Sequence, residues 1–272
     1  MDGFYCGDII GNSYTHENES FNHKTKDFEL FTERSKFSDD TILTFATIQF
    51  LMQNEKTPQK MAEIIKEFYS RYPDKTPTIY GETFATWAKN GCQTFRKSAS
   101  NGGAMRISPV GWFASNTQEI DNLVDIILTS THNTYLGKTG AKIVCYSILF
   151  LRQGLKKEEL KTKIEDIFKI DLSENINDYR NKYTYTSSAI ETVRPALISF
   201  LNSTSYEDCI RNAVSFGGDT DTITTIASSI SEAFFGVDDD IKARAYSFLP
   251  EEFKLLLTQF NTLLANKHLT LC

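Results

Sequence analysis

Cysteines in paired patterns are missing from this sequence. The five that it has are odd in number, lie far apart along the 272 residues and form no C-x-x-C pair. Neither a disulfide framework nor a zinc site is therefore predicted. Free thiols fit a reducing compartment, so we expect a cytoplasmic protein.

Long apolar runs and early basic residues are also absent. No segment approaches the roughly 20 apolar residues that cross a bilayer as a helix, and no Lys or Arg precedes Lys24. The sequence thus predicts neither a membrane span nor a signal peptide.

An excess of positive charge is lacking as well. The 29 basic and 35 acidic residues give a formal net charge of -6, which disfavours a surface specialised for binding nucleic acid. The densest basic cluster, in residues 156–163, is interleaved with glutamates. That pattern is typical of a solvated helix face.

Alternating strand patterns are scarce, and apolar residues recur at helical spacing instead. With 40% of its residues apolar, the chain can bury a large core, in which we expect Trp87 and Phe95. We expect an all-α protein, a single globular multi-helix domain over residues 1–272, and a monomer. Helices are predicted over residues 42–52, 58–72, 136–151, 156–168, 187–201, 206–216, 223–235, 239–249 and 250–265, with a further helix that includes 123–128.

Three glycines near the N-terminus recur every four residues. On a helix, Gly3, Gly7 and Gly11 would form one stripe that a partner helix could approach closely. Asp8 lies inside this short segment, which disfavours a membrane dimer motif.

The run 217–222, Gly-Gly-Asp-Thr-Asp-Thr, leads into a helical segment that Gly236 ends. Its acids should lie at a helix N-terminus, where Asp caps free N–H groups. One Asp would satisfy that need, whereas two Asp and two Thr offer the hard oxygen ligands that Mg²⁺, Mn²⁺ or Ca²⁺ prefers. For this run alone, capping and the binding of metal or phosphate both stay open.

A second acidic helix start precedes residues 42–52. Its sequence, Ser-Asp-Asp-Thr at 38–41, is by itself a common N-terminal capping sequence of a helix. If the two helix starts met in space, however, their four carboxylates would repel one another strongly without cations. The two acidic starts together therefore indicate a metal site.

A glycine-rich turn, Ser-Ala-Ser-Asn-Gly-Gly-Ala-Met-Arg at 98–106, could cradle a phosphate with exposed N–H groups. It lacks the spacing of a P-loop and a preceding strand, so a tight loop without a ligand is the alternative. His132, at the end of a predicted helix, is either a capping or dipole partner or a group that faces a ligand.

Five pieces thus occur in order: GDIIG at 7–11, SDDT at 38–41, NGGAMR at 101–106, THN at 131–133 and GGDTDT at 217–222. Together they closely resemble the ADP-ribosylglycohydrolase family, the proteins similar to dinitrogenase reductase-activating glycohydrolase. The resemblance covers nearly the whole chain. It implies an all-α fold with a centre of two Mg²⁺ or Mn²⁺ ions at the bottom of a cleft for ADP-ribose.

Carried over by position, the resemblance also implies the residues of the site. The implied metal ligands are Ser38, Asp39, Asp40, Asp219, Asp221 and Thr222. The implied contacts to the diphosphate and distal ribose are Asn101, Gly102, Gly103 and Ala104, with His132 facing the ligand.

Two positions depart from the family pattern. Ser38 stands where Thr is common, which keeps the hydroxyl ligand. Thr15 stands where an acidic residue is usual, and Glu17 and Glu19 follow in what resembles a short insertion. Either glutamate could act as the general acid/base, and the sequence does not choose between them.

The activity that the resemblance implies is hydrolysis of the glycosidic bond between ADP-ribose and an acceptor, which is a protein side chain, a nucleic-acid base or a small molecule. Such cleavage needs an oriented ribose, a water nucleophile and acid–base help, so Asp39 and Asp40 join Glu17 and Glu19 as catalytic candidates. Two alternatives stay open: a non-catalytic ADP-ribose or metal-binding module on the same fold, and another two-metal hydrolase, for instance one that acts on phosphate esters.

Overall fold

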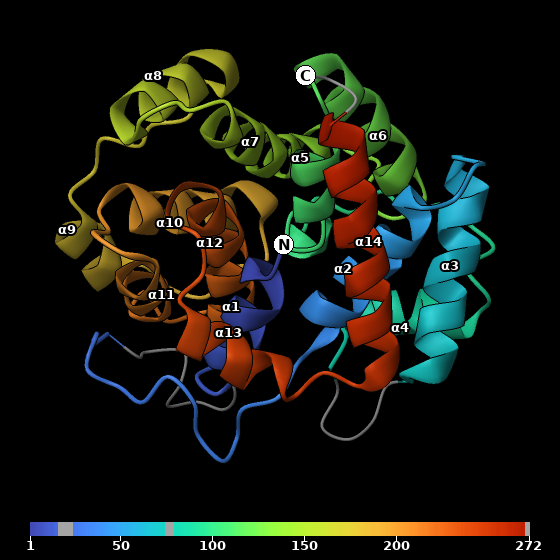
Figure 1. Ribbon diagram of the computed structural model, residues 1–272, viewed down its shortest axis with the longest axis horizontal. Coiled ribbons are helices and arrows are strands. Elements are labelled where there is room, and N and C mark those ends of the chain that lie inside the picture. The colour runs from blue at the N-terminus through green and yellow to red at the C-terminus, as the bar shows by residue number, and fades with distance from the viewer. Residues whose placement is uncertain (16–23, 74–78, 270–272) are drawn as a thin grey trace.

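The chain folds into an array of α-helices (Figure 1). The computed structural model describes residues 1–15, 24–73 and 79–269. Within these ranges no β-sheet forms, and two isolated bridges pair Lys97 with His132 and Ser100 with Ser188. The predicted all-α fold is confirmed. The elements are α1 (Gly3–Asn12), α2 (Asp39–Leu51), α3 (Pro58–Arg71), α4 (Glu82–Lys89), the 3₁₀ turn η2 (Asn101–Gly103), α5 (Ser108–Phe113), α6 (Thr117–Thr129), α7 (Tyr135–Arg152), α8 (Lys157–Phe168), α9 (Ile176–Lys182), α10 (Ala189–Leu201), α11 (Tyr206–Val214), α12 (Thr220–Phe235), α13 (Asp239–Tyr246) and α14 (Glu251–Leu269).

The long helices form where their apolar period predicts them, and local capping sets their ends. Thr57 accepts a hydrogen bond from the Lys60 N–H at 3.2 Å and Pro58 follows it, which starts α3. Gly236 adopts a φ of 76° and ends α12. Three short helices, α4, α5 and α9, were not predicted, and they have 8, 6 and 7 residues. Segments of that length are too short for a period of 3.6 to be recognised.

One predicted core residue lies at the surface. Trp87 is buried, but Phe95 is 44% exposed, so the prediction for Phe95 is wrong. Residues 95–100 alternate between exposed and partly buried positions, as in an extended strand. Because Arg96 takes the inward position and lines a cleft, its neighbour Phe95 faces solvent.

The glycine stripe of α1 packs directly against α12, and the two helices lie side by side in Figure 1. A Cβ atom on Gly3 would lie 2.5 Å from the Ser228 carbonyl oxygen, and one on Gly11 would lie 2.6 Å from that of Thr220. The hydroxyl of Ser228 also donates to the Gly3 carbonyl at 2.7 Å. The predicted close approach of a partner helix is therefore confirmed.

Helix α2 packs against α1 on one side and against α3, α5 and α14 on others. A stacked ring pair, Phe45 with Phe253 at 4.2 Å between centroids, joins α2 to α14. The N-termini of α2 and α12 meet beside α1. None of the helices in the described ranges combines the length and apolar character that a membrane crossing needs.

Candidate active site and metal centre

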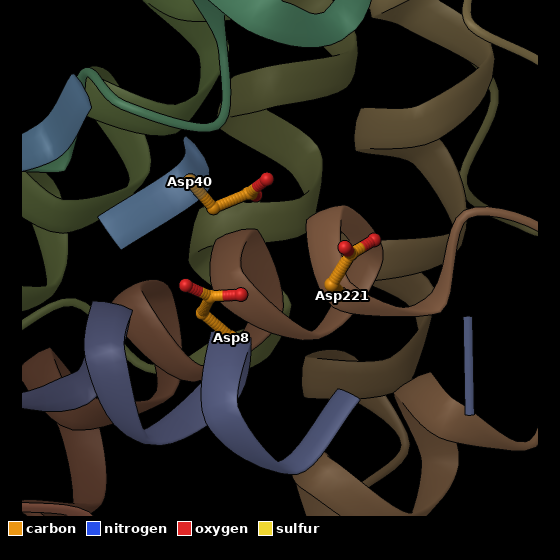
Figure 2. Close-up of side chains that lie close together, drawn as sticks. All are labelled: Asp8, Asp40 and Asp221. Carbon is orange, nitrogen blue, oxygen red and sulfur yellow. The ribbon is translucent and has the colours of Figure 1, made fainter. Parts of the chain in front are cut away.

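Three carboxylates from three different helices lie close together (Figure 2). Asp8 comes from α1, Asp40 from the first turn of α2 and Asp221 from the first turn of α12. Each contributes a carboxylate oxygen, and these oxygens lie within 4.8 Å of one another. The two acidic helix starts therefore meet in space, and they meet at a third acid, Asp8, which was not among the predicted site residues.

Asp8 is fully buried, and its contacts fix the start of α2. Its Oδ2 accepts hydrogen bonds from the N–H groups of Ser38 at 2.8 Å and Thr41 at 3.1 Å. Its Oδ1 accepts the hydroxyl proton of Ser38 at 2.7 Å. Ser38 in turn caps α2 by accepting from the Asp40 N–H at 3.2 Å. Asp8 thereby satisfies orphan donors of α2 from outside that helix.

Asp40 is only 2% exposed, yet one of its oxygens lacks a hydrogen-bond partner in the described ranges. Its Oδ2 lies 3.4 Å from the hydroxyls of Ser38 and Thr222, which is a long contact. Its Oδ1 receives no donor. A buried carboxylate oxygen without a donor is costly, and a cation would remove that cost.

Asp39 and Asp219 are half-buried and line the same cleft as Asp40 and Asp221. Asp219 precedes α12 as its N-cap, and its Oδ2 accepts from the Asn101 side chain at 2.6 Å. The turn that delivers it uses Gly217 and Gly218 at φ values of 70° and 72°, a region that favours glycine.

Burial, followed by the charge of Asp221, raises the pKa of the neighbouring acids. It raises the pKa of Asp8 to about 7 and those of Asp39, Asp40 and Asp219 well above their usual range. In the described ranges no Lys or Arg forms an ion pair with any of these groups. The cluster of carboxylate and hydroxyl oxygens therefore fits a hard divalent cation such as Mg²⁺ or Mn²⁺.

The carboxylates open into a cleft of about 390 Å³, a size typical of small-molecule sites. Asn101 and Gly102 of the glycine-rich turn line it, as does His132. Gly103 and Ala104, which were expected to contact the ligand, are not among the lining residues. The N–H of Ala104 is used within the turn, where it donates to the Asn101 carbonyl at 2.8 Å.

The backbone and side chain of His132 serve different purposes. Its N–H closes the end of α6 by donating to the Leu128 carbonyl at 2.7 Å, as the capping hypothesis predicts. Its ring lies in the cleft and packs on the turn, where a Cβ atom on Gly102 would lie 3.1 Å from Nε2. Burial, then Arg106 and Arg96, lower the pKa of His132 well below its usual value, so the ring is neutral near pH 7.

Thr15, at the position where the family pattern has an acid, lies in the cleft. Its hydroxyl oxygen accepts from the Asp221 N–H at 2.8 Å and lies 2.7 Å from the Thr220 hydroxyl. Glu17 and Glu19 lie outside the described residues. The chain re-enters the described part at Lys24, whose ammonium group donates to the carbonyls of Tyr183, at 2.7 Å, and Phe216. Both Thr15 and Lys24 are thus anchored beside the turn that carries Asp219 and Asp221.

Comparisons with known proteins agree with this arrangement. The chain is 22% identical over 264 residues to ADP-ribosylhydrolase ARH3 of Mus musculus, covering 76% of this chain and 71% of the relative. The Homo sapiens protein of the same name is 23% identical, with 76% and 73% covered. Uncharacterized protein YegU of Escherichia coli (strain K12) is 24% identical over 257 residues, with 79% and 76% covered.

A solved structure shows a similar fold. It is named ADP-ribosylglycohydrolase-related protein complex and matches with a TM-score of 0.69 at 19% identity, over 93% of this chain and 92% of that one. The sequence model of a family described as ADP-ribosylglycohydrolase matches residues 1–268. Because that match includes α1 and both acidic helix starts, and extends over nearly the whole sequence, the chain belongs to the ADP-ribosylglycohydrolase family.

Proposed function

We propose that this protein hydrolyses the glycosidic bond between ADP-ribose and an acceptor, with the help of two divalent cations. The observation that carries the proposal is the meeting of Asp40 and Asp221 with Asp8 next to a cleft that the glycine-rich turn and His132 also line. Family membership supplies the class of reaction, hydrolysis of an ADP-ribosyl bond. The acids supply the place where it would occur.

The proposed ligands of the cations are those with oxygen atoms at the two helix starts. They are Ser38, Asp39, Asp40, Asp219, Asp221 and Thr222, and the orphaned Asp40 Oδ1 supports this assignment. When bound, Mg²⁺ or Mn²⁺ would fix ribose hydroxyls and lower the pKa of coordinated water toward neutrality. Asp8 differs from this set because its two oxygens already accept three hydrogen bonds from α2, so we assign it to positioning Ser38.

The glycine-rich turn and His132 are the proposed contacts to the diphosphate and distal ribose. Asn101 links the two halves of the site, because its side chain donates to Asp219 while its residue begins η2. A sugar oriented by the turn would therefore lie next to the carboxylates. Orientation of this kind removes much of the entropic barrier to attack by water.

Proton transfer is proposed for Glu17, with Glu19 as the rival. Thr15 offers no carboxylate for that role, and its hydroxyl is held by the Asp221 N–H and the Thr220 hydroxyl. The same observation favours a second candidate function, in which the protein binds ADP-ribose without hydrolysing it.

We further expect a cytoplasmic monomer whose partner is free ADP-ribose or an ADP-ribosylated substrate.

A panel of defined ADP-ribosyl compounds tests the proposal. Conjugates to arginine, to serine, to a nucleic-acid base and to a small molecule are incubated with Mg²⁺ or with a chelator, and released ADP-ribose is measured. We expect metal-dependent release from at least one conjugate, its loss in Asp221→Asn, and normal release in Glu158→Gln on the solvated face of α8.

Two other outcomes each favour a different function. Binding of ADP-ribose by calorimetry without any turnover would identify a binding module. Turnover restricted to phosphomonoesters in a parallel assay would identify another metal-dependent hydrolase.

A further inference from the structure

A chain of hydrogen bonds starts at Arg106, which lines the cleft, and runs through His132 outside the carboxylate cluster. Arg106 Nη2 donates to the Thr131 hydroxyl oxygen at 2.7 Å, and that oxygen lies 2.9 Å from His132 Nδ1. On the other side of the ring, His132 Nε2 lies 3.2 Å from the hydroxyl of Ser100. The ring of His132 therefore connects a buried arginine to a serine that lines the cleft.

A count of protons decides how this chain is oriented. Arg106 can only donate, so the Thr131 oxygen accepts from it. Thr131 is fully buried, and its one hydroxyl proton needs an acceptor. If His132 carried its proton on Nδ1, two donors would point at Thr131 and the hydroxyl proton would have no acceptor in this chain of contacts. With Nδ1 unprotonated, Thr131 donates to it, and both the Thr131 hydroxyl and His132 Nδ1 are satisfied.

We propose that Arg106, acting through Thr131, holds His132 in the tautomer with its proton on Nε2, and so makes it a hydrogen-bond donor to an oxygen of the ligand in the cleft. Arg106 and Thr131 are positioning residues in this proposal, because neither is assigned a contact with the ligand. The identification of that ligand oxygen with ADP-ribose rests on the proposed function, whereas the tautomer does not.

The surroundings of Arg106 support its role as a fixed donor. The side chain is fully buried, and its Nε and Nη1 atoms have no hydrogen-bond partner in the described part of the chain. Burial, followed by Arg96, lowers the pKa of Arg106 only to about 10, so it stays a cation at neutral pH. The nearby cation of Arg106 also disfavours a second proton on His132.

The glycine-rich turn packs against the ring without placing a side chain over Nε2. A Cβ atom on Gly102 would lie 3.1 Å from Nε2, and one on Gly103 would lie 3.2 Å from Cγ. A side chain at position 102 would therefore cover the donor. Ser100 accepts from Nε2 in the absence of a ligand, and its own hydroxyl has Ser98 Oγ at 2.8 Å as an acceptor.

The tautomer can be measured directly in the ligand-free protein. Long-range ¹H–¹⁵N correlation spectra distinguish a protonated from an unprotonated ring nitrogen, and the chain has only 4 histidines, so the signals that vanish in His132→Ala identify this ring. We expect a protonated Nε2 and an unprotonated Nδ1. In Thr131→Val, which removes the hydroxyl and keeps the shape, this preference should be lost, and Thr131→Ser should restore it.

Binding supplies the second measurement. ADP-ribose affinity should fall roughly 5-fold in Thr131→Val, as expected for one misdirected hydrogen bond, and return in Thr131→Ser. Thr129→Val is the matched control, because that hydroxyl donates to the Asp125 carbonyl of the same helix. Its spectra and affinity should match those of the wild type.

A proton on Nδ1 in the wild type, or an unchanged tautomer in a folded Thr131→Val protein, would overturn the inference. If ADP-ribose does not bind to any variant, the proposed function fails while the spectra still decide the tautomer. A normal affinity in Thr131→Val with an altered tautomer would show that His132 does not donate to the ligand, and would overturn that part.

Discussion

Asp8 accepts the hydroxyl proton of Ser38 at 2.7 Å across the contact between α1 and α2. Because a serine hydroxyl has one proton, this bond directs the free electron pairs of Ser38 away from Asp8. They are then available to a donor or to a cation beside Asp40. The arrangement gives a buried acid on one helix control over a proposed ligand on another.

Asp8→Asn should reverse the direction of the hydrogen bond between this side chain and the Ser38 hydroxyl. The amide oxygen can still accept from the Ser38 and Thr41 N–H groups, whereas the amide nitrogen would donate to the Ser38 oxygen and occupy its electron pairs. We expect the affinity for Mn²⁺ to fall about 10- to 100-fold, as for other changes behind a metal ligand. Titration calorimetry measures this affinity, and circular dichroism verifies the fold.

The control for this prediction is a double-mutant cycle with Ser38→Ala. If Asp8 acts through Ser38, Asp8→Asn should add little to the loss already caused by Ser38→Ala. Full additivity would instead indicate that Asp8 binds the cation itself. Wild-type affinity in Asp8→Asn would contradict both roles.

The stability of the metal-free protein should decrease as pH rises. Folding raises the pKa of Asp8 to about 7, and Asp39, Asp40 and Asp219 shift in the same direction, whereas an unfolded Asp ionises near about 4. Above that lower value the native state holds protons that the unfolded state has released, so each increase in pH favours unfolding. With a chelator present, the melting temperature should therefore be lower at about pH 8 than at about pH 5.

A bound cation should oppose this effect. A free cation concentration of about 100 times Kd stabilises the native state by about 2.7 kcal/mol. This gain should be largest at the higher pH, where the carboxylates are ionised. Asp219→Asn and Asp221→Asn should each reduce the metal-dependent rise in melting temperature, and Glu158→Gln should not. A melting temperature that is indifferent to Mg²⁺, Mn²⁺ and chelator would remove the proposed centre.

The fold was predictable where local signals agree with tertiary ones. The helix starts at Ser38 and Thr57 and the end at Gly236 are all set by capping within a few residues. The stripe of Gly3, Gly7 and Gly11 predicts close packing of a second helix, because glycines on one helix face leave room for a neighbouring backbone. Phe95 was misplaced because its outward direction depends on the inward position of Arg96, which is a property of the cleft.

Gly7→Ala should destabilise the protein, although Ala is the better helix former. The added Cβ would overlap the Ser228 hydroxyl and the Thr224 carbonyl oxygen, and a backbone atom cannot rotate away. Helix propensity favours Ala by about 1 kcal/mol, whereas overpacking costs about 1–3 kcal/mol or more. We therefore expect chemical unfolding to show a net loss of stability of up to about 2 kcal/mol. Gly81→Ala is the control, since a Cβ there meets nothing within 4 Å, and its change should stay within about 1 kcal/mol.

The candidate site was predictable in part. The sequence places Asp39, Asp40, Asp219 and Asp221 at helix starts, and the structure brings them to one cleft. Asp8 was visible in the GDIIG run, but its three hydrogen bonds to α2 depend on how α1 crosses that helix. Thr15 and Asp221 are 206 positions apart in the sequence. No local sequence pattern predicts a contact between residues so far apart.

The covalent distance from Thr15 bears on which glutamate we propose as the general acid/base. Its hydroxyl is fixed 2.8 Å from the Asp221 nitrogen, and two peptide units limit the Cα atom of Glu17 to about 7 Å from that of Thr15. Four units allow the Cα atom of Glu19 up to about 14 Å, so the chain ties Glu19 less closely than Glu17 to this fixed point. Proximity to a fixed point therefore favours Glu17.

Glu17→Gln should lower kcat by roughly 10²- to 10⁴-fold, the usual contribution of a positioned acid or base, while the affinities for metal and ADP-ribose persist. Glu19→Gln is the matched comparison, because it removes the same charge from the same segment. A loss confined to Glu19→Gln would transfer the role to Glu19, and normal rates in both variants would leave activation of water to the metal ligands alone.

If the wild type hydrolyses no conjugate in the panel, Thr15→Glu becomes the informative variant. It returns a carboxylate to the position where the family pattern has one, at the cost of the bond from Asp221, and turnover gained there would identify the natural protein as a binding module that has lost its acid.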